Sequence, residues 1–411
     1  MLPKLSRYLL VFVAIFTMGY VLPSIYRTFF DVRISSPNFS YSVLNKKFYA
    51  SKYVDGQNRF SDMEGNEYTR EEYMDELPIN NFYYHLGKGT LPDSIMGVRL
   101  NPAQLRQENF YQGTAALEFS MPDYGLNPLF ESASDFGITL PKDVFRIKDR
   151  MEFVVAKTNE IDEAKSKEYT QALKDQGFVF PARVLGGIPS FMKSRDDGWF
   201  IQDSTLQLFH LKMVKGRPEV NRVNVPEGFK IRKIICNDHA SREFYATIVT
   251  DDNKLYLLMT DNYGIQPLPI EDFDANRQTL VMGGNLFYKT VILMDEAFTK
   301  VYVIDRDFKK VDELKEGLPL KSEMAIGKVE QFLFPFSIAL NKSTSLFTGI
   351  YMKKYVSWSW AILSVVLVIF TLVLIKRNNR SLKNNILDIV LVFFTGIFGF
   401  IAVHMFPNKE Y

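Results

Sequence analysis

The sequence has little of several residue types on which common protein functions depend. Cys236 is the one cysteine among 411 residues, which excludes an intrachain disulfide and a zinc site built from thiolates. The four histidines are His85, His210, His239 and His404. No two of them have metal-ligand spacing, and neither a GxxxxGK[ST] phosphate loop nor a GxSxG nucleophile elbow occurs. The sequence therefore predicts no metal, no cofactor and no catalytic residue.

An excess of charge of one sign is also absent. The chain has 49 Lys and Arg residues against 47 Asp and Glu residues, and it has no dense basic stripe of the kind that nucleic-acid binding requires. Carboxylates gather in three turns: Asp251-Asp252-Asn253, Asp305-Arg306-Asp307 and Arg195-Asp196-Asp197-Gly198. Asp and Asn are ordinary turn residues, and the alternative is a set of acids for hydrolysis or calcium binding.

Long apolar runs are present in three places, residues 8–26, 355–375 and 386–406. Each has about the 20 residues that an α-helix needs to cross a bilayer. No small-x-small cleavage site follows the first run, which favours an uncleaved anchor over a secretory signal. Trp358 and Trp360 stand at the entrance of the second, where aromatic side chains favour the headgroup zone. We therefore expect three transmembrane helices with the lipid bilayer as a partner.

The third apolar run contains one charged residue, Asp388, in its first turn. We expect this carboxylate to reach water at the interface, and the alternative is a contact with an ion or a partner, because charge inside a span is costly. Gly396 and Gly399 in the same run would let another helix approach closely, although their spacing is not that of the GxxxG motif.

Basic residues predict the orientation of the spans. The short link between the last two contains Lys376, Arg377, Arg380 and Lys383 without an acid, and short basic loops stay cytoplasmic. Lys4 and Arg7, before the first span, agree with this. Four basic residues on the other side weaken the bias: Arg27, Arg33, Lys353 and Lys354. The prediction is a cytoplasmic N-terminus and a large periplasmic domain.

Residues 27–140 have a mixed α/β pattern. Thr69 and Glu72 have the spacing of a capping box before a helix, and Asn101-Pro102 is typical of a helix N-cap with proline in the first helical position. A further helix is expected over 158–176, with Gly177 as its C-terminal cap. The pair Gly186-Gly187, followed by Ile188-Pro189, predicts a turn.

Residues 141–345 are rich in strand patterns and contain an internal repeat. Phe244–Val249 matches Phe287–Ile292, 43 residues later, and each copy is followed by a turn and a second strand, Lys254–Leu257 or Lys300–Val303. Leu206–Leu211 is a weaker copy of that second strand. Such a period in short antiparallel strands is typical of propeller blades, and an antiparallel sandwich or meander is the alternative.

The run Phe332–Leu340 is too short to cross a membrane, and Pro335 argues against a helix through its middle. We expect it to be the last core strand of the large domain rather than a segment resting on lipid.

Three segments, 62–91, Gln176–Ala182 and Leu208–Lys212, together with the spans, resemble an uncharacterised family of Bacteroidetes integral membrane proteins of unknown function. The resemblance covers nearly the whole chain. It implies a bacterial inner-membrane location and association with an ABC-type transporter, and it supplies no catalytic residues.

The sequence thus predicts a membrane protein with three transmembrane helices and a β-rich (α+β) extracytoplasmic domain, propeller-like in its C-terminal half. The expected function is non-enzymatic: a binding or scaffold domain in the periplasm, within a complex of membrane proteins. One alternative is an accessory or permease-like subunit of an ABC-type transporter, whose other subunits would be the partners. A further alternative is an envelope hydrolase.

Overall fold

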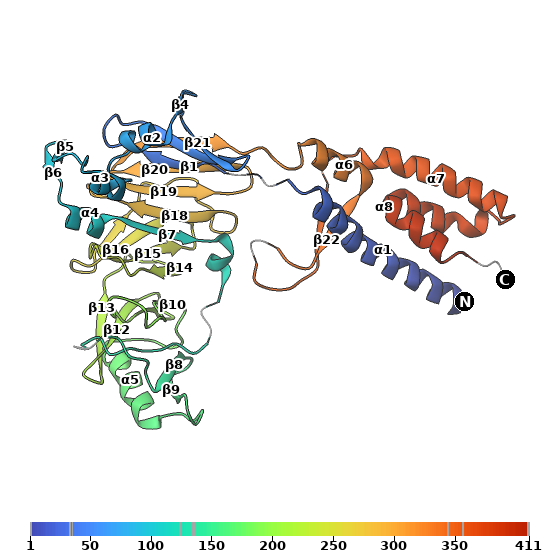
Figure 1. Ribbon diagram of the computed structural model, residues 1–411. Helices are drawn as coiled ribbons and strands as arrows, with labels where there is room; N and C mark the ends of the chain where they lie inside the picture. Colours follow the sequence, from blue (N-terminus) through green and yellow to red (C-terminus); the bar gives the residue numbers. More distant parts are fainter. Residues whose placement is uncertain are drawn as a thin grey trace. The chain divides into compact units, whose positions relative to one another are not determined.

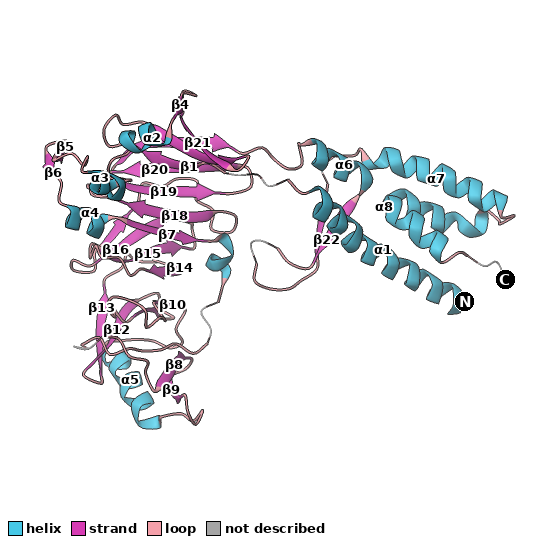
Figure 2. Ribbon diagram, in the orientation of Figure 1, coloured by secondary structure: helices cyan, strands magenta, loops and turns pink. Residues whose placement is uncertain are grey.

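The computed structural model describes residues 2–32, 34, 36–122, 125–133, 137–342, 345–355 and 357–408; Arg33 lies outside them. The chain forms two compact units. One is helical and consists of Met1–Ser36 with Gly317–Tyr411, and the other is β-rich and consists of Pro37–Glu316. Figures 1 and 2 show the elements of both.

In the part of the β-rich unit that the structure describes there are four sheets of four or five strands, mostly joined in sequence order. The first has β1 (Asn38–Tyr41), β2 (Phe48–Val54), β3 (Gln57–Asp62) and β4 (Glu67–Tyr68). The second has β10 (Val184–Gly187), β11 (Trp199–Gln202), β12 (Leu208–Val214) and β13 (Arg217–Val223). The third has β14 (Ile231–Cys236), β15 (Phe244–Thr250), β16 (Leu255–Met259) and β17 (Ile265–Pro267). The fourth has β21 (Lys310–Gly317), β20 (Phe298–Ile304), β19 (Lys289–Met294), β18 (Thr279–Gly284) and β7 (Phe110–Thr114).

Smaller elements complete the unit. The helices are α2 (Arg70–Glu76), α3 (Phe82–Lys88), α4 (Pro102–Glu108), the 3-10 helix η1 (Ala116–Ser120) and α5 (Glu163–Asp175). Two hairpins are formed by β5 (Ser94–Ile95) with β6 (Val98–Arg99) and by β8 (Asp143–Ile147) with β9 (Met151–Val155).

The predicted helix ends are largely confirmed. Thr69 and Glu72 form the capping box of α2, and the Asn101 side chain accepts a hydrogen bond from the Ala103 backbone N–H at the start of α4. Gly177 follows α5 with φ +88°. The expected start of that helix at 158 is wrong. Asp162 is the N-cap and accepts a bond from the Lys165 N–H, so α5 begins at Glu163.

The sheets pack face to face because their central strands are apolar on both sides. In β15, Ile248 packs with Phe200 of the second sheet, whereas Val249 on the other face packs with Val291 of the fourth. Side chains alternate across a strand, so one sheet fills two interlayer cores. The second, third and fourth sheets therefore form a row in sequence order (Figure 1).

Both ends of this row are covered by other elements. The outer face of the fourth sheet packs against the first sheet, where Val301 and Val303 meet Phe39. The outer face of the second sheet packs against the β8–β9 hairpin and α5, where Phe209 meets Tyr169. The expected large β-rich domain is confirmed. Within the described residues, however, the sheets form neither a closed propeller nor a barrel, because covers at both ends replace the contacts that would close a ring.

The repeated segments of the sequence form equivalent strands in neighbouring sheets. The two good copies lie on β15 and β19, each followed by its paired strand, β16 or β20. The weaker copy, of the second strand, lies on β12, which pairs with β11 as β16 pairs with β15. Strand β7, from the region expected to be mixed, pairs with β18, so early and late residues share one sheet.

Gly186 and Gly187 lie in strand β10, so the expected turn is wrong. A Cβ atom on Gly186 would lie 2.4 Å from the Ile234 Cβ, and one on Gly187 would lie 2.5 Å from the Trp199 ring. These residues are glycine because β10 passes close to β14 and to an indole ring, and not because a turn requires them.

Among its described residues, the helical unit has three helices long and apolar enough to cross a membrane. They are α1 (Leu2–Phe30), α7 (Trp360–Arg377) and α8 (Ile386–Met405). The other elements are α6 (Ala325–Leu333), β22 (Phe336–Ala339), β23 (Tyr351–Lys354) and the 3-10 helix η2 (Lys383–Asn385). Gly396 has φ +55° inside α8, and a Cβ there would lie 3.1 Å from Ser364 Oγ of α7, so close approach is confirmed at this glycine.

Asp388 does not reach water, which corrects the sequence-based expectation. Its side chain is 6% exposed and forms a two-pronged ion pair with Arg7, at 3.0 and 2.7 Å. Arg7 Nε also donates to the Phe406 carbonyl at 2.7 Å. A buried charge needs a partner and further hydrogen bonds, and here the partner comes from the opposite end of the chain.

The run Phe332–Leu340 is also placed differently from the expectation. It contains a strand, β22, but this strand pairs with β23 in the helical unit and is not part of the β-rich core. Phe334 and Phe336 pack around Phe398 of α8. These aromatic side chains fill the space beside α8 and do not belong to a sheet core.

Substitution of Gly186 by alanine tests the close packing of β10. We expect Gly186→Ala to lower the free energy of unfolding by about 1–3 kcal/mol, because the added methyl group overpacks the interface with Ile234. Gly113→Ala is the matched control in strand β7, where the new Cβ has 3.8 Å to the nearest atom. Denaturant unfolding of the full chain in detergent measures both; equal stability of the two variants would contradict the packing.

Candidate functional site

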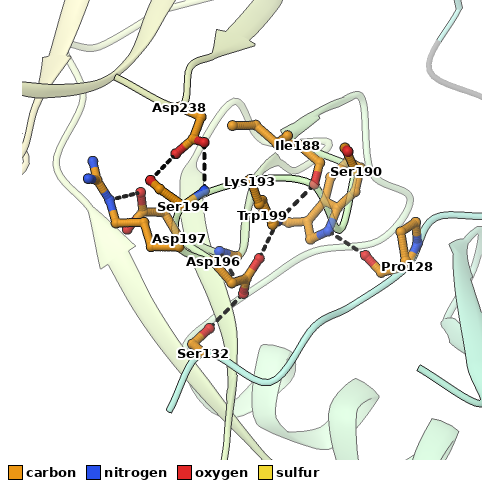
Figure 3. A network of polar contacts seen from close by, with 12 residues as sticks. Pro128, Ser132, Ile188, Ser190, Lys193, Ser194, Asp196, Asp197, Trp199 and Asp238 are labelled. Carbon is orange, nitrogen blue, oxygen red and sulfur yellow. Dashed lines mark hydrogen bonds and ion pairs between the residues drawn. The ribbon is translucent and has the colours of Figure 1, made fainter. Parts of the chain in front are cut away.

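The connection between β10 and β11, residues 188–198, is fixed by several buried polar contacts. It contains the acid-rich turn Arg195–Gly198 and lies beside the segment 128–132 (Figure 3). The Trp199 indole N–H donates to the Pro128 carbonyl at 2.9 Å, which ties this segment to the base of the loop. We call residues 188–198 the anchored loop.

Lys193 is the centre of the anchored loop. Its side chain is 2% exposed, and its ammonium group donates to Asp196 Oδ1 at 2.5 Å and to the Ile188 carbonyl at 2.8 Å. The same nitrogen lies 4.4 Å from the centroid of the Phe130 ring, a distance at which a cation is attracted to the π face. One cation therefore joins both ends of the loop to a neighbouring segment.

Asp196 is buried equally well, with 1% of its side chain exposed. Its second carboxylate oxygen accepts hydrogen bonds from Ser132 Oγ at 2.7 Å and from the Gly198 N–H at 3.2 Å. Both charges of the pair thus have additional polar partners, which is the condition under which a buried ion pair is tolerated.

Contacts with the next sheet fix the outer part of the loop. The Asp238 carboxylate, in the connection between β14 and β15, accepts bonds from the Ser194 N–H at 2.6 Å and from Ser194 Oγ at 2.5 Å (Figure 3). Arg195 donates to Asp197 at 2.8 Å and to the His239 carbonyl at 3.3 Å. The anchored loop therefore spans the edge of two adjacent sheets.

Two large apolar side chains stand at the tip of this fixed loop. Phe191 is 48% exposed and Met192 is 83% exposed. Ser190 Oγ accepts a bond from the Met192 N–H at 3.0 Å, so the backbone of the tip is also held. Buried polar anchors next to exposed apolar residues are unusual for a simple turn, which ordinarily presents polar groups to water.

Titratable groups behind the loop are held in their neutral forms. Burial lowers the pKa of His210 to about 4 and that of His239 to about 4. Burial raises the pKa of the Cys236 thiol to about 12. His210 stacks on Phe200 and contacts Tyr263 Oη and the Asp197 carbonyl. At neutral pH these groups provide neither a thiolate nor an imidazolium, and so they serve packing.

The space between these groups is too small for a substrate. A cavity of about 10 Å³ lies among Lys193, Cys236, Asn237 and Tyr245, close to the volume that one water molecule needs. Asn237 Nδ2 is buried without a protein partner. A single water there would complete its hydrogen bonding.

Larger hollows elsewhere in the unit, among them the two described next, have less organised linings. One of about 450 Å³ lies beside β1 and β18 and is lined by uncharged residues. Another of about 460 Å³ contains Lys289 and Arg306, but Lys289 is paired with Glu243 at 2.9 Å and Arg306 donates to the Leu286 carbonyl at 2.7 Å. Neither combines a buried charge with an exposed apolar group.

The other acid-rich turns do not join the anchored loop. Asp251 pairs with Lys230 and Asp252 with Lys254, at the opposite end of the strands. Asp305 accepts a bond from the Lys309 N–H within its own turn. Throughout the described ranges, no group of three or more His, Cys, Asp or Glu side chains could hold a metal ion.

Substitution of Lys193 tests the buried pair. We expect Lys193→Met to lower the free energy of unfolding by about 3–5 kcal/mol, because it leaves the Asp196 carboxylate buried without its cation. Lys310→Met is the matched control, since Lys310 and Glu313 form a pair of the same spacing on an exposed strand; its stability should be unchanged. Tryptophan fluorescence during denaturant unfolding measures both, and a neutral Lys193 variant would contradict the assignment.

Comparison with known families gives one match. Residues 38–304 match the family described as Domain of unknown function (DUF4857). The match begins at the first residue of β1 and ends at the last residue of β20, so it contains the anchored loop and excludes the three apolar helices. No curated protein and no solved structure matches the chain. With more than half of its residues in this match, the chain belongs to the DUF4857 family.

Proposed function

We propose that this protein is a non-enzymatic, membrane-anchored component of the bacterial envelope that binds another membrane protein through the anchored loop. The observation that carries the proposal is the buried Lys193–Asp196 pair beneath the exposed side chains of Phe191 and Met192. The bound partner would contribute an apolar pocket for these two side chains.

The physical basis is preorganisation. A loop that is already fixed loses little conformational freedom when it binds, so more of the contact energy appears as affinity. Large apolar side chains on such a support are typical binding hot spots, and methionine adapts to irregular pockets. The buried anchors stabilise the loop, and the tip remains free to contact a partner.

The inner-membrane location and the orientation are also proposals. Three apolar helices support membrane association. The basic segment between α7 and α8, with Lys376, Arg377, Arg380 and Lys383, supports a cytoplasmic location for this link. A periplasmic β-rich unit follows, since α1 precedes it and α7 comes after it. We further propose that its repeated sheets are propeller-like modules whose edge loops form the binding surface.

A second candidate function is an accessory subunit of an ABC-type transporter. Two features of the helical unit favour it: the buried Arg7–Asp388 pair and the break in α8 at Gly396. Charged pairs and interrupted helices inside a bilayer are common in transport proteins. In this case an ATP-binding subunit would be purified with the chain in mild detergent.

Cysteine labelling tests the orientation. In a Cys236→Ala background, we expect Glu227→Cys to react with a membrane-impermeant maleimide in cells whose outer membrane has been opened. Asn378→Cys should react only after the inner membrane is permeabilised. Both side chains are exposed, so accessibility depends on the side of the membrane. The reverse labelling pattern would contradict the orientation.

Photo-crosslinking tests the anchored loop as a docking site. A benzophenone amino acid at position 191 should form one discrete adduct with another membrane protein, whereas the same residue at Tyr53, which is 60% exposed on β2, should not. We expect Phe191→Ser with Met192→Ser to weaken binding of that protein about 30-fold, as loss of a hot spot of about 2 kcal/mol would do.

Tyr53→Ser is the matched control for this double variant and should leave binding unchanged. Undiminished binding by the Phe191→Ser, Met192→Ser chain would contradict the docking site. A chain that purifies as a monomer without any partner would contradict the proposed complex as well.

A further inference from the structure

The helical unit contains a cavity of about 610 Å³ where the last turns of α1 approach α6 and the segment that leads into α7. Its apolar lining includes Tyr26, Phe30, Met324 and Ile326. Its volume is within the range of small-molecule binding sites. It lies entirely within this unit and is remote in sequence from the anchored loop.

One wall of the cavity is a closed polar cluster. Arg27 pairs with Glu330 at 2.7 Å and donates to Ser337 Oγ at 2.9 Å and to Tyr355 Oη at 3.1 Å. The Tyr355 hydroxyl donates to Glu330 at 2.5 Å. The Tyr355 hydroxyl thus accepts a bond from Arg27 and donates one to Glu330. These groups form hydrogen bonds with one another, which fixes this wall of the cavity.

Two lysines at the cavity form no ion pair with any described residue. Lys353 and Lys354, on β23, are exposed and line the opening. Lys321, which also lines it, is already paired with Asp31 at 2.6 Å. Of the acids in the lining, Glu323 forms no ion pair with the residues that the structure describes, so two lysines and one glutamate leave a net positive charge there. An anionic group would therefore be attracted to the side formed by β23.

Exposed aromatic side chains stand near this cavity, at the ends of two apolar helices. Trp358 and Trp360 stack with 6.0 Å between ring centroids, and Trp358 is 77% exposed. Phe29 and Phe30, at the end of α1, are 77% and 54% exposed. Exposed tryptophan at the end of an apolar helix is typical of the membrane–water interface. The cavity thus combines an apolar lining and two lysines with aromatic residues of the kind that favour the headgroup zone.

We propose that this cavity binds one anionic phospholipid of the surrounding bilayer. The phosphate would contact Lys353 and Lys354, and an acyl chain would pack along Tyr26, Phe30 and Ile326. Basic pockets beside transmembrane helices are suited to such headgroups. A bound lipid would fill the space between α1 and the segment before α7, and so would stabilise the helical unit.

Native mass spectrometry of the full chain in neutral detergent tests this proposal. With phosphatidylglycerol and phosphatidylcholine of the same acyl chains added in turn, we expect one phosphatidylglycerol to be retained in preference to phosphatidylcholine. The double variant Lys353→Gln, Lys354→Gln should bind phosphatidylglycerol about 30-fold more weakly, the effect of two charges at about 1 kcal/mol each.

Lys328→Gln with Lys342→Gln is the matched control. It removes the same charge from two exposed lysines of the helical unit that do not line the cavity, and it should retain the lipid. Equal retention of both lipids, equal loss in both double variants, or a lipid-free dimer that covers the cavity would overturn the proposal. Glycerol phosphate binding as tightly as the lipid would also overturn it, because the apolar wall would then contribute nothing.

Discussion

The β-rich unit depends on one constraint, which is that its central sheets are apolar on both faces. A sheet of this kind is unstable unless a neighbour covers each side. Ile248 and Val249 are adjacent in sequence, but they belong to two different cores. The row of sheets, its covers at both ends and the return of β7 to pair with β18 all follow from the need to leave no apolar face in water.

Features that depend on neighbouring residues could be predicted from the sequence. The caps at Thr69, Asn101 and Gly177 require only residues within one turn, and the three apolar helices are defined by length and composition. The order of packing could not be predicted. Gly186 resembles a turn residue because nothing nearby in sequence reveals that Ile234 will lie against it. In the sequence Asp388 resembles an interfacial acid, because its partner, Arg7, lies near the other end of the chain.

One feature of the candidate site could be predicted from neighbouring residues in the sequence, and another could not. Phe191 and Met192 interrupt a stretch of turn residues, and this exposed apolar pair could have drawn attention to the loop. The burial of Lys193 and Asp196 had no local signal, because Phe130 and Ser132 come from a segment distant in sequence. Charged residues three apart normally indicate a solvated turn, and only tertiary contacts convert this pair into an anchor.

The pairing of Arg7 with Asp388 has a consequence for how the protein is made. The first helix leaves the ribosome long before the last one. Arg7 therefore has no ion-pair partner from α8 while almost the entire chain is synthesised. Because Arg7 lies near the first residue of α1, its guanidinium group can remain in water during this interval. The β-rich unit can fold meanwhile as an insertion between the two halves of the helical unit. The ion pair of the helical unit therefore forms only after Asp388 has been synthesised, and a chain truncated before that residue would lack the carboxylate that completes it.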